Sequence, residues 1–425
     1  MKNRRSAQDD AQDADVKRRR RAERSGERIN IDVEQEEQYN KYYYKVSKRY
    51  RALKFVSLGL LFVYLIGMMA THRSSITYEN LVYLMKDLDT DVDAARPLFS
   101  EIKYDESSKM SAAMFKGKLA LATTGSLTLY NTTGVAEREF EITMENPKVL
   151  AGDKYVMVYD VGGNSYSLYT TIIGVLSKQT EYPIQGAALS KSGSFSLITR
   201  SKENRYVVEN YDENFKKISN NYIDKYVMDV SLSGDGEKYA VVSCDVEGAS
   251  VSCCVMSGRV DSATASETVL PGAMPLSVRH FKGGNFCVVC DNMVAFFDPD
   301  GGKIAEISNK GYSLAGVSFT DSSVMIVEGV DLVGTRNTAT VFNSSGETVF
   351  SHTVESRVSS YALGDEALFI ASEGTLSKIT FDGEKEEVSC PLSVSSLVPY
   401  SDNVLVMGET SAVTAFTENV NEEEK

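Results

Sequence analysis

The sequence has few histidines and lacks the short motifs that mark several common enzyme classes. Its three histidines are His72, His280 and His352, and none belongs to an HExxH pair or to a close His/Cys cluster with zinc spacing. A GxSxG nucleophile turn and a GxxxxGK[ST] phosphate loop are also missing. A lone histidine in a strand or turn is more often structural than a general base. We therefore predict no catalytic residue, no metal site and no bound cofactor.

Cysteine is scarce as well, and its spacing argues against a metal or redox site. Cys287 and Cys290 form a CxxC inside the strand-like stretch FCVVC, where residues three apart point to opposite faces. Cys244 and Cys253 flank the turn at residues 247–249, so a symmetric hairpin would place them opposite each other. We predict a possible disulfide between them, which an extracytoplasmic domain would permit. The alternative is two buried thiols, which are common in β cores.

Long hydrophobic runs are absent except for one, FVSLGLLFVYLIGMMA at residues 55–70. Sixteen residues without a charge make a helix of ~24 Å, against a hydrocarbon core of ~30 Å. Lys54 can lengthen the span by keeping its ammonium group at the interface. We predict a transmembrane helix over residues 55–71, and a buried core helix is the alternative. Its apolar surface comprises Phe55, Leu58, Leu61, Phe62, Leu65, Ile66 and Ala70.

Charge differs sharply on the two sides of this run. Residues 1–54 carry 16 Lys and Arg against 10 Asp and Glu, a net charge of +6, and residues 71–425 carry a net −20. The positive flank is made of Lys45, Lys48, Arg49, Arg51 and Lys54. The positive-inside rule then predicts a cytoplasmic N-terminus and an extracytoplasmic C-terminal part. Met68 occupies a position where signal cleavage needs a small residue, so an uncleaved signal-anchor is favoured.

The remaining chain divides by composition. The composition of residues 1–54 predicts a basic disordered tail with a juxtamembrane segment. The spacing of apolar residues in residues 72–97 predicts a short amphipathic helix and linker. Asp89, Asp91 and Asp93 alternate like the start of a calcium loop, but the Gly and Glu that such a loop requires are replaced by Ala94 and Ser100. Residues 98–418 form the main domain, and residues 419–425 are an acidic tail.

The main domain repeats about every 40 residues. Unit starts near 110, 147, 185, 227, 275, 313, 357 and 394 each precede alternating strands separated by Gly, Asn and Asp turns. Final hairpins of such units are visible at residues 129–140, 296–307, 341–350 and 379–388. This period with four strands per unit predicts an all-β fold, a β-propeller with eight blades favoured over seven. The eighth unit has room for three strands, and residues 99–104 could supply its fourth. A β-sandwich pair fits the regular spacing less well.

Two families share features of these repeats. The turns DPDGGK at residues 298–303 and NSSGE at residues 343–347 resemble the last hairpin of WD40-type and quinoprotein-type propellers. The basic tail, the apolar run, the stretch ITYENLVYLMKDLD at residues 76–89 and the repeats together resemble an uncharacterised family of membrane-anchored propellers of Gram-positive bacteria. That resemblance implies a fold and a location but no activity. Because the chain has no tryptophan, WD40 Trp-Asp pairs and the quinone-binding blade motif are both missing.

These observations favour a non-catalytic binding or scaffold module at the cell envelope. A rigid propeller held on the outer face of the membrane would present its loops to an envelope or membrane protein. The negative charge disfavours nucleic acid as a partner. One alternative is a glycan-active enzyme with carboxylates at the channel, although abundant Asp and Glu in the turns single out no pair. Another alternative is a transmembrane sensor that signals through its basic tail.

Overall fold

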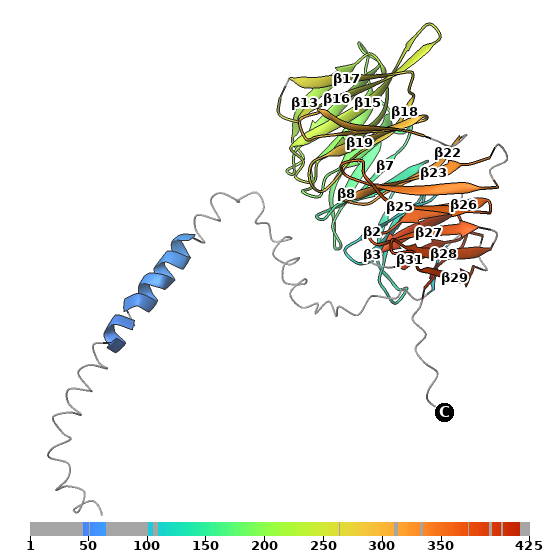
Figure 1. The fold of residues 1–425 in the computed structure, drawn as a ribbon. Coiled ribbons are helices and arrows are strands. Elements are labelled where there is room, and N and C mark those ends of the chain that lie inside the picture. The colour runs from blue at the N-terminus through green and yellow to red at the C-terminus, as the bar shows by residue number, and fades with distance from the viewer. Residues whose placement is uncertain are drawn as a thin grey trace, which may run out of the picture. The chain divides into compact units, whose positions relative to one another are not determined.

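The protein is described from a computed structural model, which covers residues 46–50, 52–64, 101–104, 109–262, 264–309, 313–331, 335–372, 374–390, 393–400 and 403–416. Residues 46–50 and 52–64 are helical, and every strand lies between residues 102 and 414 (Figure 1). The chain divides into two units, residues 1–93 and 94–425, and each is considered by itself.

The second unit consists of eight four-stranded antiparallel sheets, which we number as blades 1 to 8. Blades 1 to 4 contain β2 (Ser111–Phe115), β3 (Lys118–Ala122), β4 (Ser126–Tyr130), β5 (Ala136–Glu141); β6 (Pro147–Ala151), β7 (Val156–Asp160), β8 (Ser165–Tyr169), β9 (Gly174–Gln179); β10 (Ile184–Leu189), β11 (Phe195–Arg200), β12 (Tyr206–Tyr211), β13 (Lys217–Ile223); and β14 (Tyr226–Leu232), β15 (Lys238–Glu247), β16 (Ser250–Arg259), β17 (Ala265–Pro271).

Blades 5 to 7 follow the same order, and blade 8 borrows one strand from the start of the domain. They contain β18 (Pro275–His280), β19 (Phe286–Cys290), β20 (Met293–Phe297), β21 (Lys303–Ser308); β22 (Ser313–Phe319), β23 (Ser323–Gly329), β24 (Asn337–Asn343), β25 (Thr348–Val354); β26 (Val358–Leu363), β27 (Ala367–Ser372), β28 (Thr375–Thr380), β29 (Lys385–Ser389); and β30 (Ser396–Tyr400), β31 (Asn403–Met407), β32 (Ser411–Thr414), β1 (Ile102–Lys103).

Strand β1 closes the ring. Ile102 pairs with Ala412 and Lys103 with Ser411, so the first strand of the domain becomes the fourth strand of the last blade. The Tyr104 hydroxyl donates to the carbonyls of Gly408 and Ser411, both at 2.9 Å. This confirms the eight-bladed propeller and the borrowed strand expected from residues 99–104. The eight first strands begin within two residues of the predicted unit starts.

The first strands of neighbouring blades contact one another around the ring, which makes them the innermost strands. We call the end of the propeller where these strands begin the entry end. The loops that join second to third strands also lie there. The opposite end, with the loops joining first to second and third to fourth strands, is the exit end. Second strands are almost wholly buried because both of their faces meet a neighbouring blade, as in VMVYD of β7 and FCVVC of β19.

The predicted transmembrane helix is covered only in part. Phe55, Leu58, Leu61 and Phe62 lie in the helix of residues 52–64 with exposed side chains, whereas Leu65, Ile66 and Ala70 lie outside the described residues. Of the basic flank, Lys48, Arg49 and Lys54 are helical, and Lys45 and Arg51 lie outside the described residues. No helix in the described part of the chain combines the length and apolar character needed to cross a membrane. The span stays a prediction.

Candidate functional site

Five successive first strands carry a β-bulge at the same place near the entry end. In each of β10, β14, β18, β22 and β26 the register shifts near the start of the strand. The shift leaves the second or third residue of the strand unpaired. Those residues are Gln185, Met228, Leu276, Ala315 and Ser359, and all five are exposed. A bulge re-aims a side chain and ends regular pairing, and bulges are common at barrel rims and beside functional sites. The entry end of blades 3 to 7 therefore has a rim in which the same β-bulge recurs in each blade.

Two side chains of β14 fix its position beside β18. A carboxylate oxygen of Asp229 accepts the backbone N–H of Val278 at 3.0 Å, and the Ser231 hydroxyl accepts that of His280 at 2.9 Å. Innermost strands have no ladder partner on one edge, and these side chains satisfy amides there. Burial raises the pKa of Asp229 to about 6 and lowers that of His280 to about 3. Both carboxylate oxygens of Asp229 accept backbone amides, and His280 Nδ1 lies 3.1 Å from the Ser231 hydroxyl, which indicates a structural role for this pair.

This register brings several exposed apolar side chains together at the entry end. Tyr226 and Met228 begin β14, Met274 and Leu276 lie at the start of β18, and Val246 projects from the β15–β16 hairpin just beyond Tyr226. Their exposed fractions run from 36 to 50 per cent. We call these five residues the mouth patch. Removing apolar side chains from water is favourable, so a cluster of exposed apolar residues marks an interaction site.

The hairpin beside the mouth patch is longer than those of the other blades. Strands β15 and β16 have 10 residues each, against seven or fewer in the rest. Its last pairs, Val246 with Val251 and Glu247 with Ser250, extend past the starts of β14 and the end of β17. The guanidinium of Arg205 lies over the Tyr226 ring at 4.3 Å and holds that side chain at the base of the hairpin.

The cysteines are arranged in part as predicted. Cys244 and Cys253 are direct partners across the β15–β16 hairpin, and all six cysteines are present as thiols. A side-chain hydrogen bond with Cys290 of blade 5, together with burial, raises the pKa of the Cys253 thiol. The disulfide stays a prediction. Cys287 and Cys290 do face opposite ways, because Cys290 packs with blade 4 residues and Cys287 with blade 6 residues.

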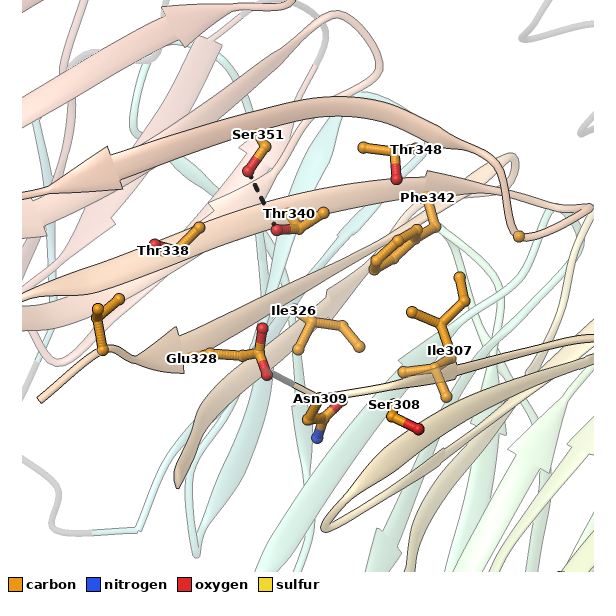
Figure 2. A pocket seen from close by; sticks show the side chains of 13 residues that line it. Ile307, Ser308, Asn309, Ile326, Glu328, Thr338, Thr340, Phe342, Thr348 and Ser351 are labelled. Carbon is orange, nitrogen blue, oxygen red and sulfur yellow. Dashed lines mark hydrogen bonds between the residues drawn. The ribbon is translucent and has the colours of Figure 1, made fainter. Parts of the chain in front are cut away.

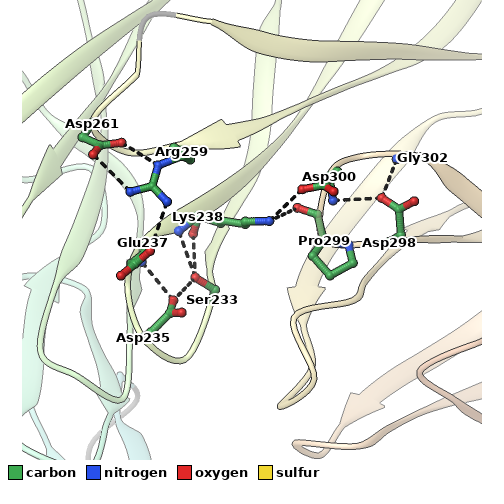
Figure 3. A network of polar contacts seen from close by, with 10 residues as sticks. All are labelled: Ser233, Asp235, Glu237, Lys238, Arg259, Asp261, Asp298, Pro299, Asp300 and Gly302. Carbon is green, nitrogen blue, oxygen red and sulfur yellow. Dashed lines mark hydrogen bonds and ion pairs between the residues drawn. The ribbon is translucent and has the colours of Figure 1, made fainter.

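A polar network links blades 4 and 5 at the exit end (Figure 3). Arg259 donates to Asp261 at 3.0 Å and to Glu237 at 3.1 Å. Lys238 reaches the next blade, where it donates to the Pro299 carbonyl and the Asp300 carboxylate, both at 2.9 Å. These ion pairs are largely exposed, so each contributes less than ~1 kcal/mol. The network is a structural tie between two blades.

Blades 5 and 6 are separated by an open groove of about 640 Å³ (Figure 2). Strands β18 and β22 have the sparsest contact of any neighbouring pair of first strands. Val294 of blade 5 packs with Ile326 and Phe342 of blade 6 in one buried apolar cluster that lines the groove. Ile307 of blade 5 packs against this cluster and also lines the groove. At the exit end the blades meet closely, because Gly346 sits where a Cβ would come within 2.8 Å of the Phe296 ring. The volume falls within the range of ~300–1,000 Å³ typical of ligand pockets.

One wall of this groove is a ladder of hydroxyl groups. Thr338 and Thr353 share a hydrogen bond at 3.1 Å across β24 and β25, and Thr340 and Ser351 share one at 3.2 Å. Thr348, opposite Phe342, continues the row toward the exit end. Because alternate residues of a strand share a face, the intervening Ala339 and Val341 point into the contact with blade 7.

A single carboxylate stands at the entry end of the groove. Glu328 is the only ionisable residue among those that line it, and the lining includes no Lys, Arg or His in the described part of the chain. Figure 2 shows its side chain directed into the cavity near Asn309. The groove thus combines an apolar floor, a hydroxyl wall and one negative group.

Metal-ligating clusters and carboxyl groups with a raised pKa are the two remaining kinds of candidate site in the described part of the chain. Within the described ranges no group of three His, Cys, Asp or Glu side chains is placed to hold a metal ion. A channel enzyme would need two or three carboxyl groups with raised pKa at one mouth. Among the described carboxyl groups a raised pKa is found for Asp229 alone, whose oxygens accept the amides of Val230 and Val278.

Neither the mouth patch nor the groove could be located from the sequence. The five bulged residues share no residue type, so their common position is set by strand pairing alone. The hydroxyl ladder did leave a signal, because Thr338, Thr340 and Phe342 alternate with Ala339 and Val341. That alternation predicts two unlike faces of β24 but does not say which one meets blade 5.

Comparisons with known proteins agree with the fold. Residues 97–413 match a family described as "Family of unknown function (DUF5711)". Among solved structures, Sqt1 of Saccharomyces cerevisiae is similar with a TM-score of 0.55 and 9% identity, over 75% of this chain and 98% of that one. BamB of Moraxella catarrhalis is similar with a TM-score of 0.50 and 10% identity, over 75% and 99% of the two chains. At such identities the likeness shows the fold alone. Curated protein sequences give no match.

Proposed function

The chain belongs to the DUF5711 family of unknown function, and from that premise we propose that it is a membrane-anchored, non-catalytic binding module. In this proposal, residues 55–71 span the membrane and the propeller lies outside the cytoplasm. The mouth patch binds a protein of the envelope or membrane, and no nucleic acid or small-molecule cofactor takes part. The mouth patch carries the proposal, because it gathers exposed apolar side chains on a rim of bulged strands.

The composition of the mouth patch suits a protein interface. Tyr226 offers a large ring with a polar hydroxyl, and aromatic residues and methionine are enriched at such interfaces. Met228 and Met274 have flexible side chains that adapt to a partner's surface. The strands beneath them are tied by the Asp229 and Ser231 hydrogen bonds, so the patch is presented without a large ordering cost.

The charge on the two sides of the apolar run supports the anchored arrangement. The basic residues before position 55 and the net −20 after position 70 support a cytoplasmic N-terminus.

The binding role is tested by crosslinking in intact cells with the full, affinity-tagged chain. The test variant is Met228→Glu with Leu276→Glu, and the matched control is Val135→Glu with Ile304→Glu, which changes two exposed apolar residues elsewhere on the propeller. We expect one envelope or membrane protein to copurify with wild type and control and to be lost with the test variant. Equal recovery with all three chains would contradict the proposal. Recovery of cytoplasmic proteins alone, through residues 1–54, would favour the signalling alternative.

The anchored topology needs its own test. A cysteine introduced at exposed Val135 should react in intact cells with a membrane-impermeant maleimide, whereas one introduced at Ser6 in the basic tail should react only after lysis. The chain should also stay with the membrane after carbonate washing. Reaction of both cysteines only after lysis would place the propeller inside the cell and overturn the orientation.

A further inference from the structure

We propose, building on the binding role above, that the protein bound at the mouth patch inserts an extended acidic segment along the axis of the ring, where Lys148 and Arg279 bind its carboxylates. The mouth patch supplies the apolar part of this interface, and the innermost strands supply two cations beside it. The charge of these strands, their exposure and their spacing around the ring support this occupant.

The innermost strands carry little charge, and their exposed charge is positive although residues 71–425 carry a net −20. Among the residues of the eight first strands, Lys148 of β6, Asp229 of β14 and Arg279 of β18 are the ones charged at neutral pH. Asp229 is partly buried, and both of its carboxylate oxygens accept backbone amides. Burial raises the pKa of Asp229 more than the charge of Arg279 lowers it. Lys148 and Arg279 are exposed, and neither forms an ion pair within the described part of the chain.

The exposed surface of these two cations faces the axis of the ring. One edge of each first strand pairs with the second strand of its blade, and first strands of neighbouring blades contact one another. Lys148 lies opposite Tyr159 and Arg279 lies opposite Cys287, and both of these partners are buried. Water therefore reaches the cations from the axis and not from the outer strands. Lys148 is the second residue of β6, near the entry end, and Arg279 lies three residues beyond Leu276 of the mouth patch.

An ion pair at the exit end shows that side chains from distant blades meet across the axis. Lys191, in the turn between β10 and β11 of blade 3, pairs with Asp321, in the turn between β22 and β23 of blade 6. These blades are three positions apart in the ring, and so are blade 2 with Lys148 and blade 5 with Arg279. One segment at the axis can therefore contact both cations. Since the ion pair crosses the axis at the exit end, the segment enters from the entry end, beside the mouth patch.

A carboxylate is the group that these two side chains recognise best. A guanidinium offers five N–H donors and can hold a carboxylate through two parallel hydrogen bonds, and an ammonium offers three donors. The negative charge of the propeller as a whole would repel a strongly acidic protein surface. We therefore expect one or two Asp or Glu residues in an otherwise neutral segment. Apolar residues next to them would cover Met228 and Leu276 at the rim.

The test measures binding of fluorescent peptides to the full chain in mild detergent. The peptides consist of Ser and Gly with two Leu residues and, three residues after them, Asp, Asn or Lys. We expect the Asp peptide to bind at least about tenfold more tightly than the Asn peptide and the Lys peptide to bind most weakly. Arg279→Gln and Lys148→Gln should each weaken the Asp peptide by about tenfold and leave the Asn peptide unchanged. The matched controls are Arg138→Gln and Lys178→Gln, which remove exposed cations of the outermost strands β5 and β9 and should change neither peptide.

Further probes identify the source of the carboxylate. A peptide without Asp but with a free C-terminal carboxylate tests a chain end against a side chain, and tight binding of either one supports the site. Succinate and inorganic phosphate serve as competitors. Equal binding of Asp peptides with and without Leu, together with displacement by either small anion, would assign the cations to a free anion and overturn the inserted segment. Equal binding of the Asp and Asn peptides by chains whose melting temperatures match wild type would overturn it as well.

Crosslinking in intact cells separates this inference from the proposed function. Arg279→Gln with Lys148→Gln should lower recovery of the envelope or membrane protein. If Met228→Glu with Leu276→Glu loses that protein, whereas the double Gln variant keeps it fully, the mouth patch stands and the inserted acidic segment is wrong. If no envelope protein is recovered with any chain, but the Asp peptide still depends on Arg279, the carboxylate site stands and the proposed partner is wrong.

Discussion

Blade 5 makes two junctions, and they are built differently. Toward blade 4 it packs a continuous apolar layer that reaches from the first strands out to β16 and β17, with Val255, Leu270 and Phe286 fully buried. Toward blade 6 the apolar layer includes Ala305 and Ile307 of β21 but, in blade 6, only Phe342 beyond β23, and the groove borders it. The third strands differ accordingly: β16 turns Cys253 and Val255 toward blade 5, whereas β24 turns threonines toward it.

This difference teaches that ring closure does not require every junction to be filled. Around a closed ring each blade is held by two neighbours, so one junction can leave apolar surface uncovered while the others supply stability. The junction of blades 5 and 6 is held at the exit end by a hydrogen bond from Lys282 N–H to the Asp321 carbonyl at 2.7 Å. Another runs from the Asn285 amide to the Ser344 carbonyl at 3.1 Å. Its outer part stays open as the groove.

Truncating one side chain at each junction of blade 5 should give the largest difference in the free energy of unfolding. Phe286 stacks on Phe297 with ring centroids 4.9 Å apart in the closed junction, whereas Ile307 lines the groove. Phe286→Ala should lower the free energy of unfolding by ~3–5 kcal/mol. Ile307→Ala should cost ~1 kcal/mol, because part of its surface already meets water. Urea unfolding measures both, and equal losses would show that the groove is as important for stability as the closed junction.

The closed junction should also respond to pH through two opposed groups. The raised pKa of Asp229, about 6, adds stability below pH 4 that is lost as the pH rises through 6. The lowered pKa of His280, about 3, gives stability above pH 6.5 that is lost as the pH falls toward 3. Between pH 7 and 4.5 the two effects are each on the order of 2 kcal/mol and nearly cancel.

Single variants should expose this balance. On moving from pH 7 to 4.5, His280→Gln should gain ~2 kcal/mol relative to wild type, and Asp229→Asn should lose ~2 kcal/mol. Urea titrations at the two pH values measure the change, and wild type serves as the reference for all other titrating groups. Parallel behaviour of the three proteins would show that neither group titrates as its burial implies.

The disulfide predicted across the β15–β16 hairpin can be tested in the same junction. If Cys244 and Cys253 are joined, adding reductant should lower the free energy of unfolding by ~2–3 kcal/mol. Peptide mapping without reductant should find the bond, and a Cys244→Ser variant should be insensitive to reductant. Labelling of all six cysteines in urea without reductant would show that they are thiols, as in the structure.

Gly346 should be the most sensitive position of the open junction. It has a φ of +86°, and an added Cβ would press on Phe296 and Ala305. Gly383 occupies the same turn of blade 7 with a φ of +96° and no atom within 4 Å of an added Cβ. Both alanine variants pay ~1–2 kcal/mol for the left-handed backbone. Gly346→Ala should cost at least ~1 kcal/mol more by thermal or urea unfolding, and equal costs would show that the contact with Phe296 is unimportant.

Exchanging Thr and Val on the third strands β24 and β16 should change stability very little in the groove and more in the closed junction. Thr340→Val in the groove wall should change the free energy of unfolding by less than ~0.5 kcal/mol, since its hydroxyl is partly exposed. Val255→Thr, in the closed junction and 2% exposed, should cost ~1–3 kcal/mol because it buries a hydroxyl. Thermal unfolding of the two variants measures the contrast. A large loss for Thr340→Val would show that the hydroxyl ladder contributes to stability.

The repeat pattern allowed most of the fold to be predicted, because alternation and turn residues act locally. The hairpins at residues 296–307 and 341–350 are β20–β21 and β24–β25, and the strand expected from residues 99–104 is β1. The candidate sites were not predicted, because they depend on which blade faces meet. The alternation at residues 338–342 distinguishes two faces of β24, but the choice of the face that meets blade 5 is made only by closure of the ring.

Closure by a strand of two residues has a mechanical consequence. Because β1 is the first strand of the propeller, a pull on the chain before Ile102 loads the β1–β32 pairing before it reaches any other blade. Only two residue pairs and the hydrogen bonds of the Tyr104 hydroxyl hold β1 to β32. Strands that follow each other within a blade are also joined covalently by their turns. A pull on this end of the propeller should therefore separate β1 from β32 first and open the ring at blade 8.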